Sequence, residues 1–183
     1  MDSSDSKVNG LNSSQVNTGH GNPRQDLQSR DQEGDLSEPI ILSSTVVKGF
    51  GRGSKQLGCP TANLEQNAVS QVDDLSTGVY YGLAILEGTV YPMVSSLGFN
   101  PHFGNQHKSL EIHLLHHFQE DFYGKLLGVA ILGKLREEAK FDSLDALIKA
   151  IEEDKRCARD MLEGKDVKHV VDMLLKLKGN HEQ

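Results

Sequence analysis

The stretch that decides the fold reads GVYYGLAILEGTVYPMVSSL and covers residues 78–97. Its first half is a run of aliphatic, aromatic and β-branched residues, which is typical of a strand. Glu87-Gly88 then forms a two-residue turn of the kind that joins antiparallel strands. We therefore expect a hairpin in which residues 78–86 pair with residues 89–97.

Further short strands are expected on both sides of this hairpin, at residues 45–50, 109–118 and 126–132. No helical pattern lies between them, which favours antiparallel pairing. Five or six such strands leave exposed edges unless the sheet closes on itself. The sequence therefore predicts a closed or nearly closed β-barrel.

The pattern becomes helical after Phe141. Asp142 and Ser143 are both good N-cap residues, and Gly164 is a plausible end for the first helix. Two stripes of apolar residues recur at helical spacing: Leu144, Leu147, Ile148, Ile151, Ala158 and Leu162, then Val167, Val170, Val171, Leu174 and Leu177. Strands followed by helices predict an α+β fold, with a helical part at about 142–178 packed on a barrel at about 39–135.

Residues 1–38 differ in composition from the rest of the chain. They are rich in Ser, Asn, Asp, Gln and Gly, and they contain no aromatic residue and no Ile. Such a segment cannot bury enough apolar surface to offset the entropy of ordering it. We expect a disordered polar tail over 1–38 and a single domain over 39–183.

Charge and composition exclude several classes of function. A net charge of −7 argues against general nucleic-acid binding, which needs a positive surface. We find no secretory signal and no apolar run of membrane-spanning length. Cys59 and Cys157 do not have the spacing of metal ligands. We therefore expect a soluble, cytoplasmic protein that binds neither nucleic acid nor membrane.

The first candidate for ligand binding is GFGRGSK at residues 49–55. Its three alternate glycines let backbone N–H groups approach a phosphate closely, and Arg52 and Lys55 add positive charge beside them. The spacing is not that of a P-loop. A flexible hairpin turn explains the glycines equally well, so both interpretations stay open.

The second candidate is PTAN at residues 60–63. The Thr61 hydroxyl and the Asn63 carbonyl are hard oxygen donors that suit Mg²⁺. Because they are two residues apart, they point to the same side of an extended segment. A turn in which both side chains satisfy local backbone groups is the alternative, and the motif alone favours that turn.

Two further candidates lie downstream. As a strand, SLEIHLLH at 109–116 places Glu111 on its polar face, where a general base could lie, although a solvated glutamate is commoner. His113 and His116 fall on opposite faces, which disfavours a zinc site. The segment GKLREEAKF at 133–141 fits either a loop that closes over a ligand or an ordinary surface connection.

Taken in order, these motifs resemble the riboflavin kinase (flavokinase) family. The matching segments are GRGSKQLGCPTANL, STGVYYGLA, SLGFNPHFGNQHKSLEIHLLHHFQEDFYG and FDSLDALIKAI, and they cover roughly residues 46–162. The resemblance is to the monofunctional eukaryotic kinase, without an adenylyltransferase domain. It implies a six-stranded antiparallel Greek-key β-barrel with C-terminal helices, and an enzyme that phosphorylates riboflavin with ATP to give FMN and ADP.

The resemblance also implies roles for single residues. Glu111 would be the catalytic carboxylate that accepts the proton of the ribityl hydroxyl. Thr61 and Asn63 would hold Mg²⁺, or another divalent cation such as Zn²⁺ or Mn²⁺, together with phosphate oxygens of the co-substrate ATP. The implied ATP contacts are Gly49, Gly51, Arg52, Gly53, Ser54, Lys55, Leu114, His116 and Tyr123. The implied flavin contacts are Arg136, Ala139 and Phe141, and we expect a monomer that binds riboflavin/FMN and ATP/ADP.

The sequence departs from the family pattern at several positions. Cys59 stands where Ile or Val is usual, and Leu83 and Phe99 stand where Trp is frequent. GKLREE at 133–138 replaces the common GYxRPE, so Lys134 stands for Tyr and Glu137 for Pro. Loss of the proline removes a restraint on φ, and we expect weaker or differently shaped flavin binding than in a variant that restores Tyr and Pro.

Two other functions stay open from the sequence alone. One is a non-catalytic flavin- or FMN-binding barrel, and the other is an interaction module that uses its helices. The combination of PTAN with Glu111 favours the enzyme, because a protein that only binds flavin needs neither metal ligands nor a base. No sequence feature specifically supports the interaction module.

Overall fold

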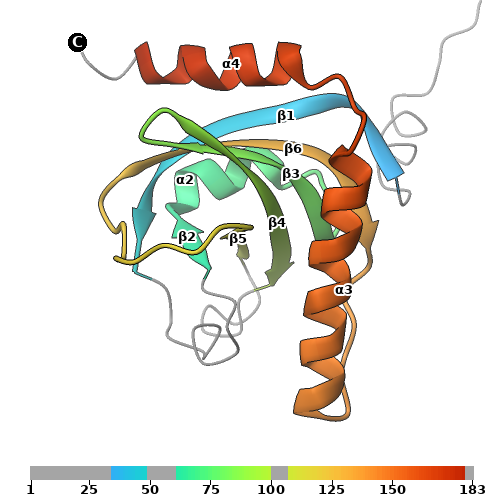
Figure 1. Ribbon diagram of the computed structural model, residues 1–183. Coiled ribbons are helices and arrows are strands. Elements are labelled where there is room, and N and C mark those ends of the chain that lie inside the picture. Colours follow the sequence, from blue (N-terminus) through green and yellow to red (C-terminus); the bar gives the residue numbers. More distant parts are fainter. Residues whose placement is uncertain (1–33, 49–60, 100–106, 180–183) are drawn as a thin grey trace, which may run out of the picture.

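Six strands form the body of this computed structural model, and two long helices follow them (Figure 1). The structure describes residues 34–48, 61–99 and 107–179. The strands are β1 (Gly34–Val47), β2 (Ala62–Leu64), β3 (Gly78–Leu86), β4 (Thr89–Phe99), β5 (Lys108–Leu114) and β6 (Leu126–Arg136). The helices are the short α2 (Gln66–Val69), the 3₁₀ turn η1 (Ser70–Val72), α3 (Leu144–Leu162) and α4 (Lys168–Gly179).

Each strand pairs with two neighbours, and every pairing is antiparallel. The order is β1-β2-β5-β4-β3-β6, and β6 pairs with β1, which closes the barrel. The neighbours β6-β3-β4-β5 form a Greek key, because β6 returns to lie beside the first of three consecutive strands. The predicted six-stranded antiparallel sheet with C-terminal helices is confirmed.

The hairpin of β3 and β4 forms as the sequence predicts. Gly78 pairs with Leu97 and Leu86 pairs with Thr89. Glu87 and Gly88 have φ values of 51° and 88°. Positive φ at both turn residues is the property of a type I′ turn, whose twist matches that of the flanking strands. The turn therefore sets the register of β4 on β3.

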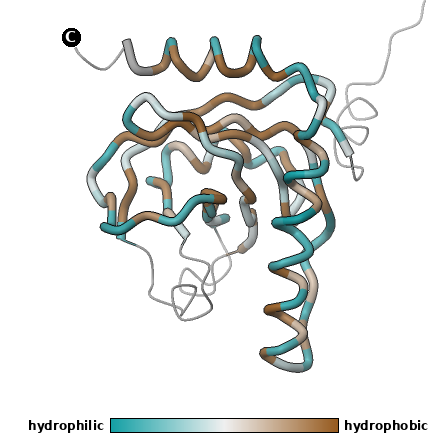
Figure 2. The backbone as a smooth tube through the Cα atoms, in the orientation of Figure 1, coloured by the Kyte–Doolittle hydropathy of each residue, from teal (hydrophilic) through white to brown (hydrophobic). Residues whose placement is uncertain are grey.

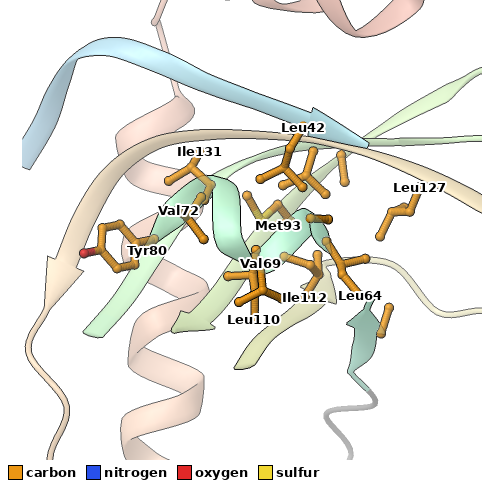
Figure 3. Close-up of a cluster of buried hydrophobic side chains, with 14 of the residues drawn as sticks. Leu42, Leu64, Val69, Val72, Tyr80, Met93, Leu110, Ile112, Leu127 and Ile131 are labelled. Atoms are coloured by element: carbon orange, nitrogen blue, oxygen red, sulfur yellow. The ribbon is translucent and has the colours of Figure 1, made fainter. Parts of the chain in front are cut away.

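Two hydrophobic clusters lie on either side of the barrel wall. Inward-facing residues fill the interior, where α2 and η1 add further side chains (Figure 3); examples are Leu42, Val69, Val72, Met93, Leu110 and Ile112. The second cluster lies outside, where Tyr81, Leu83, Ile85 and Ala130 meet Ala158, Val170 and Leu174 of the helices. β3 is buried on both faces, which explains its nearly continuous apolar sequence.

The two long helices cover the outside of the barrel. α3 contacts β3, β4 and β6, and α4 crosses β1, β3 and β6 (Figure 1). α4 alternates between hydrophobic and hydrophilic residues along its length (Figure 2), as expected of a helix with one packed face. As predicted, Ser143 is the N-cap of α3, and its Oγ accepts a hydrogen bond from the Ala146 amide at 3.1 Å. No helix in the described ranges is long and apolar enough to cross a membrane.

Several predicted strand limits need correction. β1 begins at Gly34, so residues 34–38 belong to a strand and not to the expected tail. β5 ends at Leu114, short of the predicted 118, and β6 continues to Arg136, beyond the predicted 132. Pairing explains the extra length of β1 and β6, because the polar start of β1 pairs with the end of β6. Residues 1–33 lie outside the described residues, and the division into tail and domain stays a prediction.

Long-range contacts hold the start of β1 in place. Lys165 Nζ lies 2.6 Å from Asp35 Oδ2 and 2.8 Å from the Tyr81 hydroxyl, which itself donates a hydrogen bond to Asp35 Oδ1. The hydrogen bonds from Lys165 and Tyr81 lower the pKa of the Asp35 carboxyl. Burial, followed by the bond to Asp35, raises the pKa of Tyr81. These contacts join β1 to β3 and to the turn between α3 and α4.

We expect Asp35→Asn to lower the free energy of unfolding at neutral pH by about 1 kcal/mol, because the carboxylate is half-exposed and its bonds are partly screened. The pKa of Asp35 is lower in the folded state than the unfolded value of about 3.9. The contribution is therefore present above that pH and is lost as pH falls through the folded-state pKa. Urea unfolding between about pH 7 and pH 3 should show the two proteins converging. A difference that does not shrink with acid would contradict this.

Two buried serines that face the interior of the barrel provide a second test. Ser95 is 1% exposed, and its Oγ has no hydrogen-bond partner among the described residues. Ser44 is 5% exposed, and its Oγ accepts from the Glu65 amide at 3.1 Å. We expect Ser95→Ala to raise the free energy of unfolding by about 1 kcal/mol, because an unsatisfied hydroxyl is removed. The matched control Ser44→Ala should lower the free energy of unfolding by about 1 kcal/mol. If urea unfolding shows that both variants lose the same free energy, the predicted difference between Ser95 and Ser44 is wrong.

Candidate active site

Thr61, Asn63 and Glu111 meet where β2 lies between β1 and β5. Asn63 pairs with Val47 of β1 on one side and with Glu111 of β5 on the other. Thr61 immediately precedes β2, and its Oγ1 donates a hydrogen bond to Glu111 Oε2 at 2.8 Å. All three residues are partly exposed. Two motifs that are 50 residues apart in sequence therefore form one polar site.

Strand alternation explains why this site lies on the outer face of the barrel. Successive strand residues point to opposite faces. The residues next to Asn63 and Glu111 all enter the interior cluster: Ala62, Leu64, Leu110 and Ile112. Core packing therefore fixes the register that brings Asn63 and Glu111 together, and the predicted outward orientation of Glu111 is confirmed.

Both partners of the hydrogen bond between Thr61 and Glu111 carry oxygen atoms suited to proton transfer or to cation binding. Among the described residues, the hydrogen bond to this carboxylate goes to Oε2, and Oε1 remains able to accept a proton from a ligand. The Thr61 oxygen donates its proton in this bond, and a hydroxyl oxygen is also of the hard type that binds Mg²⁺. Asn63 adds an amide oxygen of the hard type that Mg²⁺ accepts.

The residues that follow Glu111 lie in different environments. Leu114 is 3% exposed in the barrel core, so its side chain offers no surface to a nucleotide, and any contact there has to use the backbone. His116 is exposed and contacts two rings, Tyr91 in a tilted arrangement and Phe118 edge to face, with ring centroids 4.9 and 4.8 Å away. Tyr123 is 52% exposed. Tyr91 was not predicted to lie here, because its position on β4 gives no hint of these ring contacts.

Arg136, at the end of β6, is held by α3. Its Nε and Nη2 each lie 2.7 Å from a carboxylate oxygen of Asp154, and its Nη1 donates to the Glu137 carbonyl at 3.0 Å. The guanidinium is 5.7 Å from the centroid of the Phe141 ring, while Ala139 is exposed. The structure thus brings Arg136 and Phe141 together. The sequence analysis did not single out Asp154, because its pairing with Arg136 depends on the packing of α3.

With this geometry established, comparison with known proteins is informative. The flavokinase family profile, described as riboflavin kinase, matches residues 36–162. The chain belongs to the riboflavin kinase family. The human riboflavin kinase is 52% identical over 127 residues, which cover 68% of this chain and 82% of that protein.

Solved structures related to this family member share its fold. The riboflavin kinase from Trypanosoma brucei matches with a TM-score of 0.58 and 28% identity, over 74% of this chain and 87% of that one. A Streptococcus pneumoniae chain described as a macrolide-efflux protein matches with a TM-score of 0.59 and 26% identity. That match covers 75% of this chain but 46% of the other, so this chain spans about half of that protein.

Part of the expected riboflavin kinase site belongs to a segment that the structure does not describe. Gly49, Gly51, Arg52, Gly53, Ser54 and Lys55 lie outside the described residues, as does Cys59. The two ends of this segment are described, and both lie at the polar site. Val47 pairs with Asn63, and Thr61 contacts Glu111. The role of the glycine-rich segment stays a prediction.

The ion pair of Arg136 with Asp154 should stabilise the attachment of α3. We expect Asp154→Ala to lower the free energy of unfolding by about 2 kcal/mol, because a largely buried guanidinium loses its counter-ion. Glu153→Ala is the matched control, since Glu153 is exposed and pairs with Arg156 on the same helix. That control should cost less than about 0.5 kcal/mol in urea unfolding. Similar losses in both variants would contradict a special role for Asp154.

Proposed function

We propose that this chain transfers the γ-phosphoryl group of ATP to the 5′-hydroxyl of riboflavin and produces FMN and ADP. The observation that carries this proposal is the hydrogen bond between Thr61 and Glu111, with Asn63 beside it, in a member of the riboflavin kinase family. A barrel that only binds flavin needs no carboxylate placed next to two hard oxygen donors. The arrangement therefore favours catalysis over simple binding.

Glu111 is the proposed general base. Thr61 holds one of its carboxylate oxygens, which restricts the side chain and directs the other oxygen toward an incoming hydroxyl. The backbone around Glu111 is held on both sides, because Glu111 pairs with Asn63 of β2 and with Ser96 of β4. A base on a rigid strand is positioned more accurately than one on a loop. Phosphoryl transfer depends mainly on such positioning.

The residues present fit a divalent cation that is shared with the nucleotide. No group of three His, Cys, Asp or Glu side chains in the described ranges is arranged to hold a metal alone. Thr61 Oγ1 and Asn63 Oδ1 would hold Mg²⁺, or Zn²⁺ or Mn²⁺ in its place, with ATP phosphate oxygens completing its ligands. When bound, the cation would neutralise charge on the transferred group.

The proposed flavin half lies on the same outer face as Glu111. On β4, residues 94, 96 and 98 alternate with the inward residues Met93 and Leu97. Ser96 pairs with Glu111 across the sheet, and the carboxylate of Glu138 lies where a side chain on Gly98 would be. Gly98 is about 7 Å along the strand from Ser96. The segment that carries Ala139 and Phe141 thus passes near the base, which supports their assignment to flavin.

The remaining assignments extend the proposal to the nucleotide. Exposed aromatic rings at His116 and Tyr123 offer surfaces for the ATP base, and Leu114 contributes backbone only. The glycine-rich segment from Gly49 to Lys55 is proposed to hold the phosphates, because Val47, before it, and Thr61, after it, both lie at the polar site. Cytoplasmic location, a monomeric state and the absence of nucleic-acid and membrane partners stay predictions.

Replacement of the base tests the function directly. Glu111→Gln keeps the size of the side chain and its bond to Thr61 but cannot take up a proton, so we expect kcat for FMN formation to fall by at least about 100-fold. ADP binding, measured by calorimetry, should change by less than about twofold. FMN is measured by chromatography after incubation with ATP, Mg²⁺ and riboflavin.

Two results would overturn parts of this proposal. Robust turnover by Glu111→Gln would remove Glu111 from the role of base. Absence of FMN from the unmodified protein, with ATP binding intact, would refute the kinase activity itself.

A further inference from the structure

Lys134 is a buried lysine at the end of β6. Its side chain is fully excluded from solvent. Nζ lies 2.6 Å from Glu137 Oε1, donates a hydrogen bond to the Ser76 hydroxyl, and is 5.9 Å from the centroid of the Tyr80 ring. A buried ammonium group is tolerated only when a counter-ion and hydrogen-bond acceptors surround it. Glu137 supplies that charge.

The backbone around Lys134 is shaped to admit its side chain. A Cβ atom at Gly78 would lie 2.7 Å from Lys134 Cε and 2.6 Å from the carbonyl oxygen of Arg136. Any larger residue at position 78 would therefore displace the lysine or the end of β6. Ser76 lies just before β3 and Gly78 is its first residue, so Lys134 joins the start of β3 to β6.

Glu137 begins a stretch that has no regular secondary structure. β6 ends at Arg136 and α3 begins at Leu144, so neither a strand ladder nor a helix holds residues 137–143. Glu137 is nevertheless fixed twice. Lys134 binds its carboxylate, and Arg136 Nη1 donates to its backbone carbonyl at 3.0 Å. These two contacts fix the first residue of the stretch at the end of β6.

We propose that Lys134, Ser76 and Glu137 form a clasp that positions residues 137–141 and thereby sets the affinity for flavin without touching it. This inference rests on the proposed function, because the positioned segment carries Ala139 and Phe141. Lys134 and Glu137 are also the two positions at which the segment departs from the family's Tyr and Pro. The ion pair therefore provides a restraint in place of the proline ring.

Kinetics provide the first test of the clasp. Glu137→Gln removes the counter-ion, and because Glu137 is exposed the variant should fold. We expect its KM for riboflavin to rise about fivefold, with kcat and the KM for ATP within about twofold. In Glu137→Asp, which keeps the charge, the KM for riboflavin should rise less. Glu153→Gln is the control, since it breaks an exposed Glu–Arg pair of the same spacing on α3 and should change nothing.

A double-mutant cycle tests whether the two charges act as one unit. Lys134→Met keeps the length of the side chain and removes the ammonium group, so it should raise the riboflavin KM in the same direction as Glu137→Gln. The double variant should be no worse than the more affected single variant, because both remove the same interaction. Additive effects of the two single changes would overturn the clasp.

Hydrogen exchange gives a readout that does not depend on activity. Amides of residues 138–143 should exchange faster in Glu137→Gln and Lys134→Met than in the unmodified protein, and Glu153→Gln should leave them unchanged. A raised riboflavin KM without faster exchange would overturn the clasp, as would faster exchange with an unchanged KM. If the unmodified protein makes no FMN, the proposed function fails, while the exchange rates still decide whether Lys134 and Glu137 restrain the segment.

Discussion

Closure of the sheet through β2 is the constraint on which the rest of the structure depends. This strand has three residues and contributes two residue pairs to β1 and two to β5. Without it, β1 and β5 would each expose an edge of unpaired backbone groups. Thr61 and Asn63 would also no longer lie beside Glu111. The pairs that close the barrel are thus the pairs that assemble the candidate site.

Local signals were enough to predict the parts of the fold that depend on neighbouring residues. The turn at Glu87 and Gly88 and the cap at Ser143 belong to this class, because each is determined within a few residues. β2 could not be recognised as a strand, since three residues are too few to display a period of two. The start of β1 was missed because its polar residues are ordered by partners such as Lys165, which lies far away in the sequence.

In the candidate site, too, features that depend on neighbouring residues could be predicted, and features that depend on distant partners could not. Strand alternation was sufficient to place Glu111 outside the barrel and its neighbours inside. It also indicates that Leu114 points inward, like Leu110 and Ile112, so a contact of Leu114 with ATP would have to use its backbone. The pairing of Arg136 with Asp154 could not have been found this way, because it depends on where α3 docks. Burial of Lys134 likewise depends on the segment before β3.

The pairing of β1 with β6 has a consequence for how the chain reaches its folded state. Of the described strands, β1 leaves a ribosome first, and most of its partners, such as Ala130 opposite Ile41, belong to β6, which leaves last. One edge of β1 therefore stays open throughout translation of the intervening strands, and the nascent chain exposes it to other chains. The barrel can close only after β6 has emerged, so α3 and α4 dock on it after most of the polypeptide has been synthesised.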